Sequence, residues 1–298
     1  MMSTMTVGRV GIDRVLEHEM ATRPPTQMFP GLDPAGWHAQ RSWLAPHYWD
    51  PATDLLQTCV QTWVLRTDSE TVLVDTGVGN GKSRPGLPAF DGLSTDFLDR
   101  LRAVGVAPED VTVVVNTHLH ADHVGWNTRL DNDEWAPTFP NATYLVPRAD
   151  YEFWHPDAAG RPRIGNANDN VFTDSVLPIQ RAGLLRLWDG AHQVTGDLRL
   201  ELAPGHTPGS SVLTLESGAD RAVFVGDLLH NPIQIHQPEV NSCFCEDPAA
   251  ARASRRRLLA WAADHRALVF PAHLRGGLAA EIGRSAGAFA VKKWGFST

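Results

Sequence analysis

The chain has 298 residues and a formal net charge of −8, with 26 Lys and Arg against 34 Asp and Glu. This composition is typical of a globular protein, and its acidic balance disfavours a nucleic-acid-binding protein, which concentrates positive charge. No apolar run reaches the roughly 20 residues of a membrane span, and no signal peptide is recognised. The three cysteines form no disulfide framework, which favours a reducing, cytoplasmic compartment, and Cys243 and Cys245 are expected to be small buried thiols rather than zinc ligands.

The first half of the chain begins with a segment, residues 1–50, that we predict to be an N-terminal arm of the same domain as residues 51–298. Residues 21–50 are rich in proline and aromatic residues, which indicates an irregular segment that packs on the body or lines a pocket mouth. A strand is expected at 71–75, ending at Asp75. A helix from Ser94 to Gly105 and a buried strand at 111–116 follow.

The second half repeats this order. A strand at 222–226 ends at Asp227, a helix begins after Asp247, and a strand at 267–270 is followed by His273. Further strands are expected at 143–146, 198–202 and 212–215. The order strand, Asp, helix, strand, His therefore occurs twice, which predicts an internally duplicated α/β fold. Ligands bind outside strand ends in such sheets, so these polar residues should converge there.

Histidine is in excess, with 13 residues, and it is the most common metal ligand in proteins. Residues 118–123 read HLHADH, directly after a predicted strand, so one loop can turn His118, His120, Asp122 and His123 toward one point. Imidazole and carboxylate are suitable ligands for divalent transition metals. Further ligand types follow later apolar stretches, namely His206, Asp227 and His273.

Together these motifs resemble the metallo-β-lactamase superfamily: VLVDTG at Asp75, HLHADH at 118–123, PGHTPGS at His206, VFVGD at Asp227 and FPAH at His273. The resemblance implies a four-layer αββα sandwich with the site at one edge, between two sheets. It implies two divalent metal ions. Zinc is the preferred identity, and Mn, Fe and Co are alternatives. One would be held by His118, His120 and His206 and the other by Asp122, His123 and His273, with Asp227 bridging and Asp75 orienting the loop.

The segment 226–234 and the helix that contains Arg255 look like the branch of methyl-parathion hydrolases and quorum-quenching lactonases. This implies that a hydroxide shared by two metals opens a lactone or cleaves an ester. Organophosphate or aryl-ester hydrolysis is the alternative; thioester hydrolysis and iron-dependent oxidation are less favoured. Asp122 and Asp227 would be catalytic. His230 would contact the small-molecule substrate, at a position where related lactonases commonly carry Tyr, or would only bond nearby backbone.

Two tryptophans are candidate substrate contacts. Trp126 directly follows the metal loop, and Trp154 belongs to a polar, aromatic segment at 151–163. With residues 21–50, this segment is expected to form an apolar pocket. The N-terminal extension also makes a homodimer a prediction, because the parathion-hydrolase-like relatives associate through such a segment.

Overall fold

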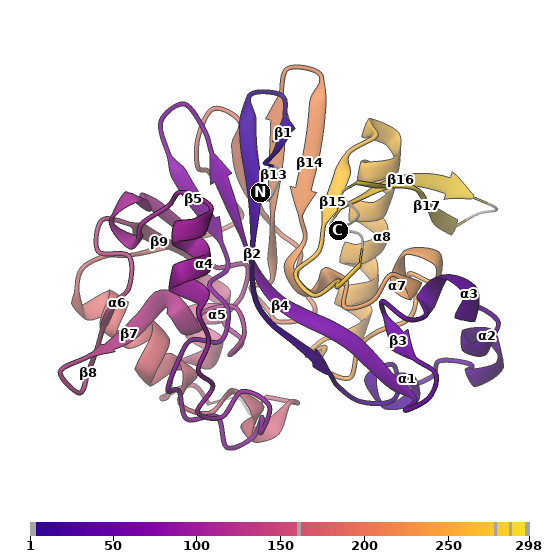
Figure 1. The fold of residues 1–298 in the computed structure, drawn as a ribbon, viewed down its shortest axis with the longest axis horizontal. Helices are drawn as coiled ribbons and strands as arrows, with labels where there is room; N and C mark the ends of the chain where they lie inside the picture. Colours follow the sequence, from indigo (N-terminus) through magenta and orange to yellow (C-terminus); the bar gives the residue numbers. More distant parts are fainter. Residues whose placement is uncertain (1–3, 160–161, 277–278, 286–287, 296–298) are drawn as a thin grey trace.

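The computed structural model describes residues 4–159, 162–276, 279–285 and 288–295 (Figure 1). The first sheet contains, in spatial order, β1 (Met5–Val7), β2 (Val10–Ala21), β4 (Leu55–Arg66), β5 (Thr71–Val74), β6 (Val113–Val115), β9 (Thr143–Pro147) and β10 (Leu185–Trp188), with β3 (Trp49–Asp50) paired to β4. The second sheet contains β11 (Ala191–Gln193), β12 (Leu198–Leu202), β13 (Ser211–Ser217), β14 (Asp220–Phe224), β15 (Leu268–Phe270), β16 (Ala279–Ser285) and β17 (Ala288–Gly295). A separate pair is formed by β7 (Thr128–Asp131) and β8 (Glu134–Pro137).

The two sheets face each other across a shared apolar core, to which β5 and β13 contribute Val72, Val74, Leu213 and Leu215. Helices cover the outer faces: α4 (Phe97–Ala103) and α6 (Leu177–Arg181) pack on the first sheet, and α8 (Pro248–His265) packs on the second (Figure 1). Two further helices are α5 (Arg148–Trp154) and α7 (Ile233–His236). Short 3-10 turns span Pro108–Asp110, Gly125–Asn127, Gly165–Asn168 and Gly226–Leu228, and one π turn spans Phe172–Val176. The αββα sandwich expected from the sequence is confirmed.

The internal duplication is visible in the strand directions. β5 pairs in parallel with β6, and β14 pairs in parallel with β15, with α4 or α8 in the connection between the partners. The ends of parallel partners lie at the same edge of a sheet, so Asp75 and His118 emerge together from one sheet. Asp227 and His273 emerge together from the other. The α8 helix begins as predicted, because the Asp247 side chain accepts hydrogen bonds from the amides of Ala249 and Ala250.

Part of the N-terminal segment, residues 1–50, is a long regular strand, β2. β2 pairs with β4 along Gly11–Ala21, so this strand belongs to the first sheet. Val10 and Ile12 face the core between the sheets, and Val15 faces the apolar cluster on the other side of the first sheet, which explains that placement. Residues 1–3 of the predicted arm lie outside the described residues. The arm is therefore restricted to the part of the chain that follows β2.

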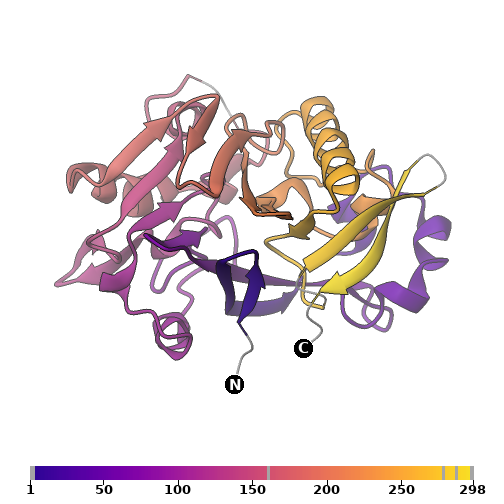
Figure 2. The same cartoon turned by 90° about the horizontal axis from the view of Figure 1, so that it is seen from above.

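Residues 25–44 of this shorter arm form three short helices, α1 (Pro25–Met28), α2 (Pro34–His38) and α3 (Arg41–Leu44). They lie at the same end of the molecule as α7, β16 and β17 (Figure 2). Phe29, Trp37 and Trp49 pack there against Ile233 and Leu274 in one apolar cluster. Most of the aromatic residues of the arm therefore bury apolar area, and only its first residues are free to line a pocket.

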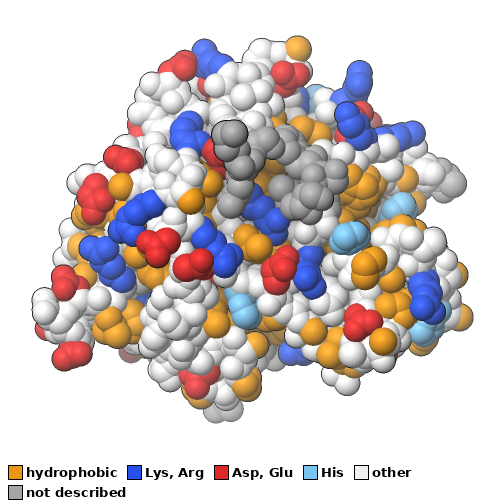
Figure 3. Space-filling model, in the orientation of Figure 1, with side chains coloured by type: hydrophobic (Ala, Val, Ile, Leu, Met, Phe, Trp, Pro, Cys, Tyr) orange, Lys and Arg blue, Asp and Glu red, His pale blue; other side chains and the backbone are white. Residues whose placement is uncertain are grey.

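The surface carries both signs of charge. Lys and Arg side chains are intermixed with Asp and Glu over the face that Figure 3 shows. Within the described residues, no helix combines the length and apolar character that crossing a membrane requires.

The arm contributes to stability through Trp37, which is 1% exposed and lies edge-on to Trp49 with ring centroids 5.7 Å apart. We expect Trp37→Ala to lower the free energy of unfolding by about 3–5 kcal/mol, because it removes a large buried ring. Urea denaturation measures this. Leu130→Ala is the control, since Leu130 is 51% exposed and its loss should change stability by less than about 0.5 kcal/mol.

Candidate metal centre

The seven predicted metal ligands meet between the two sheets, at the edge where β6, β14 and β15 end. They form two groups, and in each group the ligand atoms lie within 4.8 Å of one another. The first group contains His118, His120, His206 and Asp227, and the second contains Asp122, His123 and His273. All except Asp122 are buried. The structure thus divides the ligands as the family resemblance implies.

Asp227 lies between the groups and faces each with a different oxygen. Its Oδ2 is 3.1 Å from His206 Nε2, and its Oδ1 is 2.8 Å from His273 Nε2 and 3.1 Å from His123 Nε2. The residue before it, Gly226, has φ +48°, and a Cβ there would lie 2.6 Å from Thr117 Oγ1. Any other residue at position 226 would be strained by this φ and would clash with Thr117, so the turn before Asp227 requires glycine. This placement is the one that a bridging carboxylate requires.

Asp75 is hydrogen-bonded to the loop that contains His118–His123. Its Oδ1 accepts from the Thr117 amide at 2.7 Å, and its Oδ2 accepts from Thr117 Oγ1 and His123 Nδ1, both at 2.8 Å. Thr117 Oγ1 is also 3.1 Å from His118 Nδ1. Because the Nδ1 atoms of His118 and His123 are bonded in this way, the Nε2 atom of each carries the lone pair that faces the centre. His273 is oriented similarly, since its Nδ1 donates to the Cys59 carbonyl at 2.8 Å.

The donor atoms crowd together as cation ligands do. His120 Nδ1 lies 3.1 Å from His118 Nε2 and 2.9 Å from His206 Nε2, and His123 Nε2 lies 3.2 Å from His273 Nε2. Burial lowers the pKa of His118 and His120 well below the usual value, so both imidazoles are neutral. Converging lone pairs repel unless a cation lies between them. The residues therefore fit two divalent cations, and nitrogen and oxygen ligands of this kind suit zinc.

The carboxylates around His123, in the second ligand group, also favour a bound cation. Burial acts to lower the pKa of His123, but Asp227, Asp75 and Asp122 outweigh it and raise this pKa well above the usual value. Three carboxylates around one buried imidazole create a strongly negative environment. A divalent cation at this position would neutralise it.

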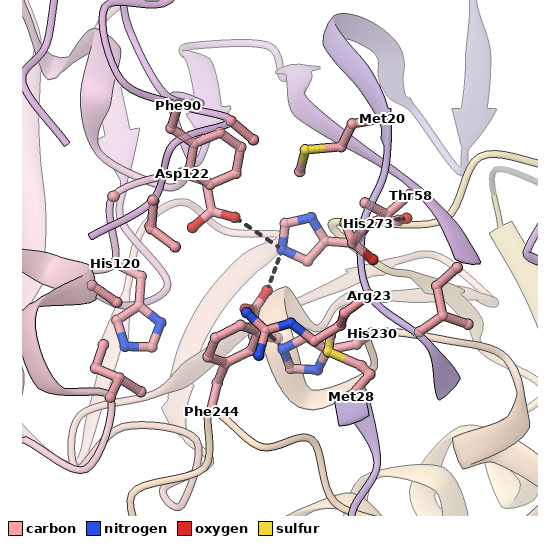
Figure 4. A pocket seen from close by; sticks show the side chains of 18 of the residues that line it. Met20, Arg23, Met28, Thr58, Phe90, His120, Asp122, His230, Phe244 and His273 are labelled. Atoms are coloured by element: carbon pink, nitrogen blue, oxygen red, sulfur yellow. Dashed lines mark hydrogen bonds and ion pairs between the residues drawn. The ribbon is translucent and has the colours of Figure 1, made fainter. Parts of the chain in front are cut away.

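The centre forms the floor of a cavity of about 340 Å³. His120, Asp122, His230 and His273 reach this floor (Figure 4). The walls above them are mostly apolar and include Met20, Met28, Leu87, Phe90, Ile164 and Phe244. The end of β2 and the start of the arm supply one wall, as the sequence suggested for the arm. Of the predicted polar segment 151–163, residues 160–161 lie outside the described residues.

His230 lies at the edge of the centre, where the sequence predicts a substrate contact. Its Nε2 is 3.2 Å from Asp227 Oδ2, and its backbone N–H donates to Gln234 Oε1 at 2.7 Å. Burial lowers the pKa of His230 to about 4, so the ring is neutral near pH 7. Neither ring nitrogen has a hydrogen-bond partner of good geometry among the described residues. A neutral imidazole with an unused N–H can donate to a substrate oxygen.

The two predicted tryptophan contacts are placed differently. Trp126 stacks on Phe97 at 5.2 Å in the core, and its Nε1 donates to Glu17 Oε1 at 2.6 Å. Trp154 lies edge-on to the His120 ring at 5.3 Å. Among the described residues that line the cavity, neither tryptophan is present. The assignment of Trp126 to the pocket is therefore corrected: the chain turns away from the cavity after His123, and the indole supports the loop from behind.

Glu17 and Asp150 contribute to the site although sequence reasoning did not find them. Glu17, on β2, accepts from the amides of Val78 and Gly79, which follow Asp75. Burial raises its pKa to about 7. Asp150, on α5, accepts from the Leu119 amide at 2.9 Å and the Gly209 amide at 2.6 Å. It therefore ties the His118–His123 loop to the His206 loop. Each is a single acidic residue without a motif, so the sequence offered no signal.

The cysteines have the placement of buried thiols. All three are free; Cys59 and Cys245 are buried, and Cys243 is half-buried. Neither group of metal-ligating side chains found among the described residues includes a cysteine.

The fold and site place the chain in a known class. It belongs to the metallo-β-lactamase superfamily, whose family model matches residues 60–273. Among curated proteins, it is 27% identical to an N-acyl homoserine lactonase of Bacillus sp. over 55% of this chain and 61% of that enzyme. It is 35% identical to the N-acyl homoserine lactonase AttM of Rhizobium radiobacter over 39% of this chain and 40% of that enzyme. The matches thus span about three fifths or less of these relatives.

Two solved structures share the fold over nearly the whole length. One is AidC, a dizinc quorum-quenching lactonase in complex with its product, with a TM-score of 0.80, 21% identity and coverage of 100% and 98% of the two chains. The other is the hydrolase AbOPH, with a TM-score of 0.83, 23% identity and the same coverage. At 21% and 23% identity, the similarity to these two structures shows a shared fold.

The position of Asp227 between the two ligand groups predicts its effect on metal content. Wild-type protein loaded with zinc and freed of excess metal should hold about two ions per chain. Asp227→Asn should hold one or fewer, because a neutral amide leaves too little negative charge for two cations. Elemental analysis measures the ratio. Asp189→Asn is the control, since Asp189 forms an exposed ion pair with Arg148 and its loss should leave two ions bound.

The hydrogen bonds that Glu17 accepts from Trp126, Val78 and Gly79 predict that Glu17 stabilises the fold. Glu17→Gln should lower the free energy of unfolding by about 1–3 kcal/mol, because an amide NH₂ would face N–H donors. Urea denaturation measures this.

Trp126→Phe should also destabilise the fold while leaving the KM of any substrate unchanged within about twofold, since the ring lies behind the loop. A large change in KM without loss of stability would show instead that Trp126 contacts the substrate.

Proposed function

We propose that the chain is a dinuclear metal-dependent hydrolase that opens a lactone ring or cleaves an ester. The observation that carries the proposal is the position of Asp227, which offers one oxygen to each of two ligand groups at the floor of an apolar cavity. We propose zinc as the metal, because the donor set suits it and the structurally similar lactonase AidC is a dizinc enzyme.

Bound divalent cations would supply an activated water and polarise the oxygen that is attacked. The side chains around them have separate tasks. Asp122 is the least buried of the seven, so it is placed to exchange a proton with the leaving oxygen. His230, neutral near pH 7, is placed to donate a hydrogen bond to the substrate carbonyl. Asp75 and Asp150 keep the two loops in position during the reaction.

The cavity supports a small substrate with an apolar part. Its volume of about 340 Å³ lies at the small end of the range of ligand pockets, and its walls include Phe90 and Phe244. The related curated proteins are N-acyl homoserine lactonases, so acyl-homoserine lactones are the first compounds to test. Aryl esters and phosphotriesters are the second class, because the same floor can face a phosphoryl centre.

The test is a panel of acyl-homoserine lactones, other γ- and δ-lactones, aryl esters and phosphotriesters, with metal-loaded protein. We expect the largest kcat/KM for a lactone. Asp227→Ala should lose more than about 100-fold, because even groups that only support metal ligands contribute about 10–100-fold.

Two outcomes would contradict the proposal. One is equal turnover by wild type and Asp227→Ala, which would place the chemistry elsewhere. The other is a protein that holds two metals and hydrolyses no lactone or ester in the panel.

A further inference from the structure

The cavity contains a cationic side chain that no step of the proposed hydrolysis uses. Arg23 follows β2 and is half-buried in the cavity wall. Its guanidinium lies over the ring of Phe244, with Cζ 4.9 Å from the ring centroid. Figure 4 shows it on the same side of the cavity as His230 and Met28. An arginine stacked on an aromatic face is held in a defined orientation, with its N–H groups directed along the plane.

The hydrogen-bond capacity of Arg23 is largely unused. The ion pairs of the described residues include none to Arg23, and its side chain donates from Nη1 to Cys243 Sγ at 3.4 Å. A thiol is a weak acceptor. Arg275 is differently placed, because it pairs with Glu19 at 3.1 Å and donates to Gln57. A guanidinium has five N–H donors, so Arg23 has donors left for a ligand in the cavity.

The segment that holds Arg23 is also tied to the metal centre. The Cys243 amide donates to the Met28 carbonyl at 2.7 Å, and the Glu246 amide donates to the His206 carbonyl at 3.0 Å. Between them, the Phe244 ring lies under Arg23 and is nearly parallel to the His230 ring, with centroids 6.3 Å apart. This arrangement fixes the guanidinium relative to the ligand His206. Cys243 and Phe244 are therefore positioning residues for Arg23.

We propose that Arg23 determines substrate specificity by binding an oxygen acceptor on the part of the substrate that is not cleaved. The inference rests on the proposed function and adds a substrate class to it: lactones or esters with a carbonyl or carboxylate oxygen remote from the scissile bond. The neighbouring wall residues Met20, Met28 and Phe244 offer such an oxygen no side-chain donor. A polar atom buried against these three side chains would lose its bonds to water, and the Arg23 guanidinium can replace them.

The experiment compares three γ-lactones of equal chain length, bearing an acylamino group, a terminal carboxylate or only an alkyl chain. We expect Arg23→Met to lower kcat/KM at least about 10-fold for the first two, mainly through KM, and to change the alkyl lactone by less than about threefold. A larger loss for the carboxylate would identify an anion as the preferred acceptor, and a larger loss for the acylamino group would identify a neutral carbonyl. Cys243→Ala should produce a smaller loss in the same direction.

Arg256→Met is the matched control, since Arg256 pairs with Glu239 on the surface and should leave all three reactions unchanged. Binding of the three ring-opened products to zinc-loaded protein, measured by calorimetry, gives a second readout that needs no turnover. Equal losses on all three compounds, or no loss on any, would overturn the role of Arg23. If the wild type hydrolyses none of the lactones, the proposed function fails, and the calorimetry still decides whether Arg23 recognises the acceptor.

Discussion

One carboxylate connects the two halves of this protein to one centre. Asp227 follows β14 and directs its oxygens to histidines that come from both sheets. A buried carboxylate is costly unless it is paired with positive charge or with hydrogen-bond donors. Its pKa is held well below the usual value by the surrounding histidines against the opposing effect of burial. This one side chain is kept in place by the strand ends, by the glycine at 226 and by the loops around the centre.

The sequence predicted the elements that carry local patterns. The strand at 71–75, the helix after Ser94 and the helix after Asp247 have apolar patterns, and all are present in the structure. The helix after Asp247 also has a side-chain N-cap, whereas the helix after Ser94 has none. The ligand set was predictable because four of its members lie within one short loop and the others follow strands. The parallel strand pairs then bring those ends to one edge, which the repeated order of elements already indicated.

The residues that surround the ligands could not be predicted in this way, because their roles come from contacts between distant segments. Glu17 supports Trp126 across 109 positions, and Asp150 accepts from Gly209 across 59. Neither has a spacing that the chain reveals. Trp126 was misplaced for a related reason: nearness in sequence to His123 does not say which way the loop turns. Arg23 lies in a segment that is rich in proline and aromatic residues, and nothing in that pattern indicates which single polar side chain faces the cavity.

The proposed chemistry depends on two metals that bind on either side of Asp227. An anomalous difference map, calculated at the zinc absorption edge from crystals of the zinc-loaded protein, would locate them. We predict two peaks about 3.5–4 Å apart, one beside His118, His120 and His206 and the other beside His123 and His273, with Asp227 between them. A single peak, or peaks away from Asp227, would contradict this assignment.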